Sequence, residues 1–229
     1  MIVDVIIPAF NEELSIHKVL LDIPKDLVRE IVVVNNNSTD NTRKVAEEHG
    51  ARVVDETKKG YGNACLKGIE YLTAKTEKPD IVVFLDADYS DYPDQLNCLV
   101  DPIKLKEKDL VIGSRVLGIA EKNSLTIQQR FGNWLATRLI HLFYGFRYTD
   151  LGPFRAIDFN KLLDLEMNDT TYGWTVEMQL KAIKNKLRIM EVPVNYRKRI
   201  GVSKISGTIK GTLLAGYKIL STIFKYSFS

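Results

Sequence analysis

Short runs of valine and isoleucine alternate with segments of helical periodicity through the first half of the chain. Such runs, each bounded by polar or turn-forming residues, predict buried strands, and the segments between them predict helices. The predicted strands cover residues 3–9, 30–36, 51–56, 80–88 and 109–115. The predicted helices cover residues 12–23, 38–50, 62–75 and 93–106, with Ser38 or Thr39 as the cap of the second. Strands that alternate with helices indicate an α/β fold with a mostly parallel central sheet and helices on both faces.

The second half of the chain has a different pattern. A basic and aromatic segment over roughly residues 124–146 has helical periodicity, and the sequence YTDLGPFRAID at 148–158 is predicted to be irregular. Further helix, including residues 173–182, precedes a predicted strand over 187–196. No linker rich in proline, glycine or serine divides the chain, so we expect one domain over residues 1–204.

Residues 205–229 are predicted to form an amphipathic helical tail. Its apolar positions recur every three or four residues, at Ile205, Ile209, Leu213, Tyr217, Leu220 and Phe224. Lysines at 210, 218 and 225 interrupt this stripe. The pattern suits a helix that lies on an anionic membrane surface. It equally suits a helix that packs on the domain or in a dimer.

Composition excludes several classes of protein. A net charge of only +3 over 229 residues does not indicate a general nucleic-acid-binding surface. Cys65 and Cys98 are too few for a disulfide framework. The N-terminus lacks the features of a signal peptide, and no apolar run reaches 18 residues. We therefore expect a cytoplasmic protein, peripheral on the cytoplasmic face of the membrane if it meets one.

Candidate chemistry begins where the fourth predicted strand ends, in FLDADYSDYP. The chain has neither the G-x-G-x-x-G motif of dinucleotide-binding folds nor the G-x-x-x-x-G-K-[ST] motif of P-loops. Any phosphate that it binds must therefore be held by other residues. In an extended chain, Asp86 and Asp88 project to the same side, at the edge of the sheet where such folds bind ligands. Hard oxygen ligands of this kind suit Mg²⁺ or Mn²⁺. The alternative is that both are exposed turn aspartates.

Four segments occur in order with suitable spacing: VIIPAFNE, VVVNNNSTDNT, FLDADYSDYP and VIGSR. As a set they resemble the family-2 inverting glycosyltransferases, which have the GT-A fold, a Rossmann-like nucleotide-diphospho-sugar transferase fold. Among these, the chain is most similar to the dolichyl- or polyprenyl-phosphate hexosyltransferases. The resemblance runs from residue 3 to about residue 205. It implies a nucleotide-sugar-binding half over 1–115 and an acceptor-binding half over 116–204.

The resemblance also implies roles for individual residues. The implied nucleotide-sugar-binding residues are Pro8, Phe10, Glu12, Asn35, Asp86 and Asp88. Asp86 and Asp88 would hold a divalent cation that bridges the two phosphates of the donor. Asp88, Arg115 and Arg130 are the implied catalytic residues, with the arginines facing phosphates near the reaction centre. Relatives usually carry an aspartate at the position of Asn35, which leaves the base open between UDP and GDP.

The basic segment NYRKRIGVSKISG is similar to the R-x-x-G-x-S-K segment of the lipid-phosphate enzymes. The implied acceptor-phosphate residues are Arg130, Arg197, Arg199, Ser203 and Lys204. A phosphate monoester is already an anionic nucleophile at neutral pH and needs a cationic cradle rather than a base. The alternative interpretation of this segment is a solvated basic loop.

These features lead to three functional hypotheses. The first is metal-assisted, inverting transfer of a hexose, mannose or glucose, from a GDP- or UDP-sugar to a polyprenyl or dolichyl phosphate. The second keeps the donor but uses a soluble or glycan hydroxyl as acceptor, with Asp150 or Glu177 as the base. The third is a sugar-nucleotide-binding protein without turnover.

Overall fold

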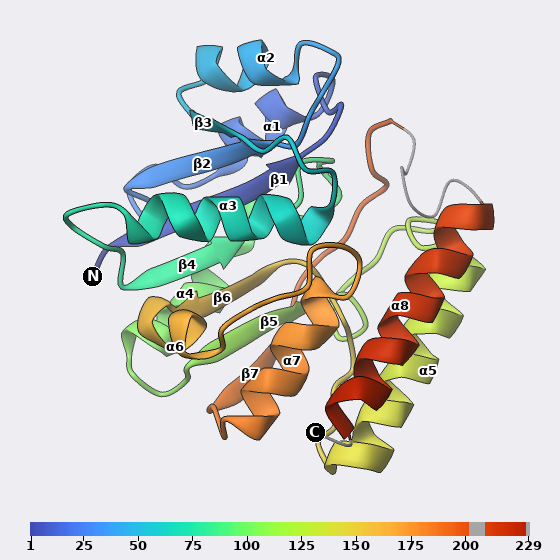
Figure 1. The fold of residues 1–229 in the computed structure, drawn as a ribbon. Helices are drawn as coiled ribbons and strands as arrows, with labels where there is room; N and C mark the ends of the chain where they lie inside the picture. The colour runs from blue at the N-terminus through green and yellow to red at the C-terminus, as the bar shows by residue number, and fades with distance from the viewer. Residues whose placement is uncertain (202–208, 228–229) are drawn as a thin grey trace.

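The computed structural model describes residues 1–201 and 209–227 and shows a central sheet with helices on both faces (Figure 1). Its seven strands are β1 (Val3–Ala9), β2 (Glu30–Asn35), β3 (Arg52–Asp55), β4 (Ile81–Phe84), β5 (Leu110–Ser114), β6 (Arg155–Asp158) and β7 (Ile189–Pro193). They lie in the order β3-β2-β1-β4-β6-β5-β7. Neighbouring strands are parallel except around β6, which runs antiparallel to both β4 and β5. The predicted fold class is confirmed.

The helices divide between two apolar cores, one on each face of the sheet. One core receives side chains from α1 (Ile16–Asp22), α2 (Thr42–Glu48) and α4 (Leu96–Lys104), which follows a short 3₁₀ turn at Pro93–Gln95. The other receives side chains from α3 (Tyr61–Thr73), α5 (Ile127–Tyr144), α6 (Phe159–Asp164), α7 (Trp174–Lys184) and α8 (Ile209–Ser227). The central strands therefore need apolar residues on both sides, which explains their unbroken valine and isoleucine runs.

The second helix begins later than predicted. α2 starts at Thr42, and the Asp40 carboxylate accepts hydrogen bonds from the backbone nitrogen (3.0 Å) and hydroxyl (2.5 Å) of Thr42. Ser38 is not its cap, because the Ser38 hydroxyl accepts instead from the Asn11 backbone nitrogen. The Ser38–Asn11 bond thus ties the segment after β2 to the segment after β1.

Strand β6 is the element that the sequence did not predict. It is four residues long and begins with Arg155, a charged side chain with no exposed surface. The Arg155 guanidinium donates to the backbone oxygens of Thr175 (3.0 Å), Leu151 (3.3 Å) and Gly152. These bonds engage both terminal nitrogens of a buried cation that the residue pattern alone would place at the surface. They also fasten the turn before β6 to the start of α7.

The C-terminal helix packs on the domain along one face. Thr222 and Ile223 of α8 are buried, and the Tyr144 hydroxyl of α5 donates to the Ile223 carbonyl at 2.8 Å. Lys218 forms an ion pair with Asp169 at 2.9 Å. Helices α5 and α8 lie side by side (Figure 1). No helix in the described part of the chain is both long and apolar enough to cross a membrane.

Replacing Gly68 of α3 with alanine should destabilise the fold. A Cβ at this position would lie 2.7 Å from Cγ2 of Ile6 in β1, a stiff and fully buried side chain. We expect the free energy of unfolding to fall by about 1–3 kcal/mol, measured by urea denaturation. Gly132→Ala in α5 is the control, because nothing lies within 4 Å of its Cβ and a helical alanine should stabilise by about 0.5–1 kcal/mol. Equal urea midpoints for the two variants would contradict the close packing of Gly68 against Ile6.

Candidate functional site

Two adjoining cavities open at the carboxyl edge of the sheet. The first, about 300 Å³, lies beyond β1, β2 and β4 and is lined by Pro8, Phe10, Glu12, Asn36, Asp86 and Asp88, among others. The second, about 310 Å³, lies beyond β5 and is lined by Arg115, by one face of α5 and by Ala215, Gly216 and Ile219 of α8. Five residues line both: Tyr61, Asp86, Asp88, Tyr172 and Arg199. Ligands bound in the two cavities can therefore contact each other next to these shared side chains.

The carboxylates of the FLDADYSDYP segment lie in a turn and not, as expected, in extended chain. β4 ends at Phe84, and the chain turns through Asp88 and Tyr89, whose φ of 63° is left-handed. The turn still brings Asp86 and Asp88 to both cavities. Asp88 Oδ1 accepts from the backbone nitrogen (2.9 Å) and hydroxyl (2.5 Å) of Ser90. The turn is therefore held by the carboxylate itself.

This turn concentrates buried negative charge. Burial, and next the charge of Asp88, raise the pKa of Asp86 to about 7. Burial also raises the pKa of Asp91 well above its ordinary value, with Asp86 and Asp88 adding to the effect. Among the described residues, Oδ1 of Asp86 and both carboxylate oxygens of Asp91 have no hydrogen-bond partner. A positive charge bound next to these buried carboxylates would therefore stabilise their ionised form.

Of the two arginines in the loop after β7, Arg199 supplies part of that charge and Arg197 does not. Arg199 contacts Asp88 Oδ2 at 3.0 Å through Nη1 and Glu12 Oε1 at 2.8 Å through Nη2. Arg197 instead packs its guanidinium carbon 3.3 Å from the ring centre of Tyr89 and donates to the Tyr89 carbonyl at 2.7 Å. Arg197 lines neither cavity. The expectation that it binds acceptor phosphate therefore finds no support, because its guanidinium is committed to holding this loop on the turn.

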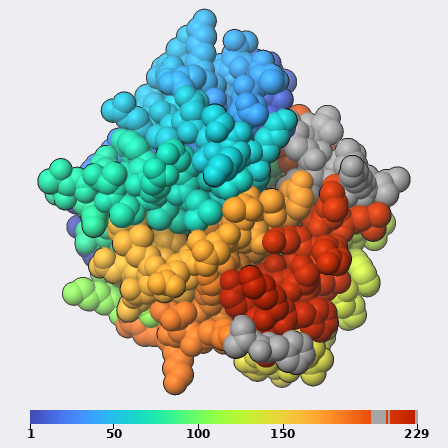
Figure 2. All heavy atoms as spheres, viewed as in Figure 1, coloured from blue at the N-terminus to red at the C-terminus, as the bar shows by residue number. Residues whose placement is uncertain are grey.

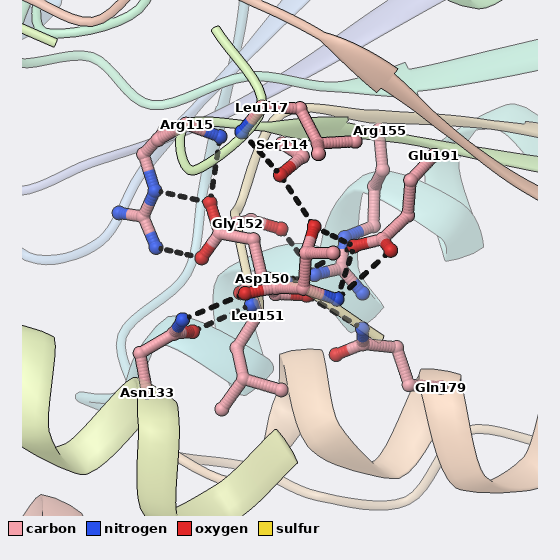
Figure 3. Close-up of polar contacts among 11 residues, drawn as sticks. Ser114, Arg115, Leu117, Asn133, Asp150, Leu151, Gly152, Arg155, Gln179 and Glu191 are labelled. Atoms are coloured by element: carbon pink, nitrogen blue, oxygen red, sulfur yellow. Dashed lines mark hydrogen bonds and ion pairs between the residues drawn. The ribbon is translucent and has the colours of Figure 1, made fainter. Parts of the chain in front are cut away.

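Arg115 reaches the second cavity from the end of β5 and is held from behind by Asp150 (Figure 3). Its Nε and Nη2 each lie 2.7 Å from one Asp150 oxygen, and its backbone nitrogen donates to the same carboxylate at 2.8 Å. Burial alone would lower the pKa of Arg115, but the charge and hydrogen bonds of Asp150 outweigh it and raise the pKa. Arg115 is therefore a fixed, permanently charged donor at the cavity wall.

The segment that carries Asp150 is itself fixed by three side chains (Figure 3). Glu191 accepts from the backbone nitrogens of Thr149 and Asp150, and Gln179 donates to the Asp150 carbonyl at 3.0 Å. Asn133 accepts from the Leu151 nitrogen at 2.9 Å. Contacts from β7, α7 and α5 thus converge on the residues that hold Arg115.

Neither predicted base candidate is placed to act as one. Asp150 is 1% exposed, and both its oxygens bind Arg115. Glu177 is also 1% exposed and accepts from the Asp169 nitrogen (2.7 Å) and the Tyr226 hydroxyl (2.7 Å) while it pairs with Lys181. Neither carboxylate lines a cavity. Their residue types suggested acid–base chemistry, and tertiary contacts give them positioning roles instead.

Two further predicted site residues lie outside the two cavities. Arg130 is exposed and lies away from the cavity, because the residues of α5 that line it are Gln128, Gln129, Gly132 and Asn133. Asn35 donates to Asp55 at 2.9 Å and lies outside the first cavity, whose wall contains Asn36. Ser203 and Lys204 fall outside the residues that the structure describes. Pro8, Phe10 and Glu12 line the first cavity, where their predicted roles require them.

Asn36 was missed although it directly follows β2. Its amide nitrogen donates to the carbonyls of Glu56 (3.1 Å) and Lys58 (2.7 Å), and its oxygen accepts from the Gly60 nitrogen (2.8 Å). These bonds shape residues 56–60, of which Lys59 and Gly60 line the first cavity. The alternation of side chains along the strand could have identified Asn36. It places Asn36 on the same side as Val32 and Val34, which face α3.

The fit of a divalent cation depends on Asp86 and Asp88. No group of three or more histidine, cysteine, aspartate or glutamate side chains in residues 1–201 and 209–227 has the geometry of a metal site. Mg²⁺ and Mn²⁺ nevertheless often take only one or two carboxylates and complete their shell with water and substrate phosphates. The buried Asp86 Oδ1 without a partner is a suitable donor atom. The residues present therefore fit a cation that binds together with a phosphorylated substrate.

This arrangement of paired aspartates beyond β4 and an arginine beyond β5 can be compared with known proteins. The profile of the family described as Glycosyl transferase family 2 matches residues 4–170. The chain belongs to this family. An uncharacterised glycosyltransferase of Mycobacterium tuberculosis is 36% identical over 217 residues, which cover 93% of this chain and 94% of that protein. The protein is therefore a family-2 glycosyltransferase, as the resemblance predicted.

Two similar glycosyltransferases have named lipid acceptors. The undecaprenyl-phosphate mannosyltransferase of Micrococcus luteus is 31% identical over 219 residues, covering 90% of this chain and 88% of that protein. The UDP-N-acetylglucosamine–dolichyl-phosphate N-acetylglucosaminyltransferase of Methanococcus voltae is 30% identical over 210 residues, covering 82% and 83%. Among solved structures, glucosyl-3-phosphoglycerate synthase of Mycobacterium tuberculosis superposes with a TM-score of 0.78 at 22% identity, covering 99% of this chain and 80% of that one. That likeness identifies the GT-A fold.

Asn36→Ala should weaken binding of UDP or GDP more than Asn35→Ala does. Loss of the three Asn36 bonds releases residues 56–60 at the cavity wall. About tenfold weaker binding is expected, because one buried hydrogen bond contributes about 1 kcal/mol or more. Isothermal titration of the glycosyltransferase with each nucleotide measures the effect. Asn35→Ala is the matched control, and a larger loss for this variant would contradict the placement of Asn36.

Proposed function

We propose that this glycosyltransferase moves a hexose from a nucleotide diphospho-sugar to a polyprenyl phosphate, with inversion and with a divalent cation. The observation that supports it best is the composition of the second cavity. Its described lining contains Arg115 and Arg199, and the carboxylates in that lining are Asp86 and Asp88 alone, the two proposed metal ligands. A hydroxyl acceptor would need a further carboxylate to take its proton. A phosphate monoester needs only the positive charge.

The two cavities then take the two substrates. The first cavity receives the nucleotide, and Asp86 and Asp88 hold the cation at the junction. When bound, that cation stabilises the negative charge that develops on the departing diphosphate. Arg115 lines the second cavity, where it orients the incoming phosphate. Because Asp150 fixes Arg115 before substrates arrive, little reorganisation is needed during transfer.

The relatives with lipid-phosphate acceptors support this acceptor class. The structurally similar glucosyl-3-phosphoglycerate synthase, solved with phosphoglyceric acid, represents the alternative of a soluble acceptor. Its sequence identity of 22% is lower than the 30% and 31% of the two lipid-phosphate enzymes. We therefore favour the lipid phosphate and make the soluble acceptor an outcome of the test.

The outer face of α5 and α8 supports a membrane-bound acceptor. Large apolar side chains stand exposed on it, including Ile127 (83%), Phe131 (60%), Leu213 (68%) and Tyr217 (74%). Neither 127–144 nor 209–227 contains an aspartate or glutamate, while 127–144 contains two arginines and 209–227 contains three lysines. α8 lies at the molecular surface (Figure 2), and both helices also wall the second cavity. We propose that this face rests on the cytoplasmic surface of an anionic membrane.

The charge on this face favours a bilayer over a second copy of the chain. A symmetric dimer through it would bring like charges together, whereas anionic headgroups would neutralise them. The apolar side chains can enter the headgroup region at the same time. A polyprenyl phosphate in that bilayer would then present its phosphate next to the mouth of the second cavity.

Donor and acceptor class can be tested in one assay. Radiolabelled UDP- and GDP-hexoses are incubated with Mn²⁺ or Mg²⁺ and with polyprenyl phosphate, polyprenol or 3-phosphoglycerate. Label should enter the organic phase with the lipid phosphate alone. Asp88→Ala or a chelator should abolish transfer, and Arg115→Met should lower kcat/KM by about 100–1000-fold. Arg130→Gln, assayed in detergent, is the control, because Arg130 lies outside the cavity. Transfer to 3-phosphoglycerate or polyprenol would overturn the proposed acceptor.

Membrane contact can be followed through Trp134. The chain has two tryptophans, and Trp174 is 1% exposed whereas Trp134 is 53% exposed on α5. Vesicles with phosphatidylserine should shift the fluorescence to shorter wavelength and co-sediment the protein, and purely zwitterionic vesicles should do so less. The double variant Phe131→Ser, Leu213→Ser should lose about tenfold or more of the affinity. Leu21→Ser, 65% exposed on α1, is the control. Equal losses of vesicle affinity in the two variants would contradict the proposed membrane contact of α5 and α8.

A further inference from the structure

We propose that Arg199 occupies the cation's place at Asp88 in the metal-free enzyme, and that metal binding releases it to the acceptor phosphate. The inference rests on the proposed function only for the identity of that phosphate. It assigns Arg199 a role in both cavities, and it imposes an order in which the donor with its metal binds before the acceptor.

The oxygens of Asp88 show why the two cations compete. Oδ1 accepts two hydrogen bonds from Ser90, within the turn itself. Oδ2 is the oxygen that faces Arg199 Nη1, at 3.0 Å. Mg²⁺ binds carboxylate oxygens at about 2.0–2.1 Å, so a metal on Oδ2 would sit where the guanidinium now makes its contact. A second positive charge at that distance would repel the first.

Arg199 is also held in a way that permits exchange. Its guanidinium has contacts to two carboxylates, Asp88 and Glu12, and its side chain remains 28% exposed. The backbone beside it is anchored separately, since the Ile200 nitrogen donates to the Asp88 carbonyl at 2.9 Å. Arg199 already lines both cavities. The side chain can therefore turn toward the second cavity while the backbone at Ile200 stays bound to Asp88.

Arg197 shows the contrast within the same loop. Its guanidinium stacks on Tyr89 and Tyr92 and donates to the carbonyls of Tyr89 and Asp91. A metal at Asp88 does not contest any of these partners. The loop thus contains one arginine that fixes the backbone and one whose partner is the metal ligand itself.

The consequence is a link between the two substrates. Without metal, an acceptor phosphate in the second cavity meets Arg115, whereas Arg199 is engaged by Glu12 and Asp88. Once the cation and donor take Asp88, Arg199 becomes available to the acceptor. The same exchange would disfavour acceptor binding before the sugar donor is in place.

The first test uses Mn²⁺ alone, with the full-length protein and no nucleotide. Free Mn²⁺ is measured by electron paramagnetic resonance during titration. Arg199→Gln and Arg199→Met should bind Mn²⁺ about 5–150-fold more tightly than the wild type. Lys198→Gln removes the same charge from an exposed neighbour and should change affinity by less than about twofold, because solvent screens it. Affinities of both Arg199 variants equal to that of Lys198→Gln would overturn the competition.

The second test measures the link, with farnesyl phosphate as a soluble probe. Mn²⁺ and nucleoside diphosphate together should tighten wild-type binding of this probe by about fivefold or more. In Arg199→Gln that gain should disappear. A gain that persists in the variant would overturn the transfer of Arg199 to the acceptor. Failure of the lipid-phosphate assay leaves the Mn²⁺ result unaffected, so the two proposals can fail separately.

Discussion

The buried carboxylates of the turn after β4 must be balanced by positive charge, and much of the site follows from this requirement. Asp86, Asp88 and Asp91 lie within six residues, and burial raises the pKa of both Asp86 and Asp91. The chain contains no basic residue between them. Compensating charge therefore comes from the end of β5 and from the loop after β7, which the fold must bring together at one edge of the sheet.

The antiparallel strand β6 makes that edge rigid. Because β6 runs opposite to its neighbours, the residues before it reach the same edge as the residues after β5. Asp150 thereby meets Arg115, and Glu191, Gln179 and Asn133 fix the segment from three other elements (Figure 3). Arg115 is preorganised by these contacts, whereas Arg199 contacts the Asp88 oxygen that we propose for the metal. One site thus combines a fixed cation with an exchangeable one.

The helices α5 and α8 give the second cavity a wall and the molecule an apolar, acid-free face. Small residues of α8, Ala215 and Gly216, lie at the cavity. On the other side of the same helices, large apolar residues stand exposed. A lipid acceptor accounts for both features, because its phosphate needs the cavity and its chain needs the bilayer.

The sequence by itself determined the alternating α/β core, the family, and the nearness of Asp86 and Asp88 to the ligand edge. Apolar runs and ordered motifs are local properties, and local patterns suffice to predict them. It did not predict β6, whose leading residue is a buried arginine that donates to three carbonyls from two segments. Nor did it separate Arg115 from Arg130, or Arg199 from Arg197. Only the tertiary structure decided these, since the role of a charged side chain depends on which distant partner meets it and on which face of its helix it lies.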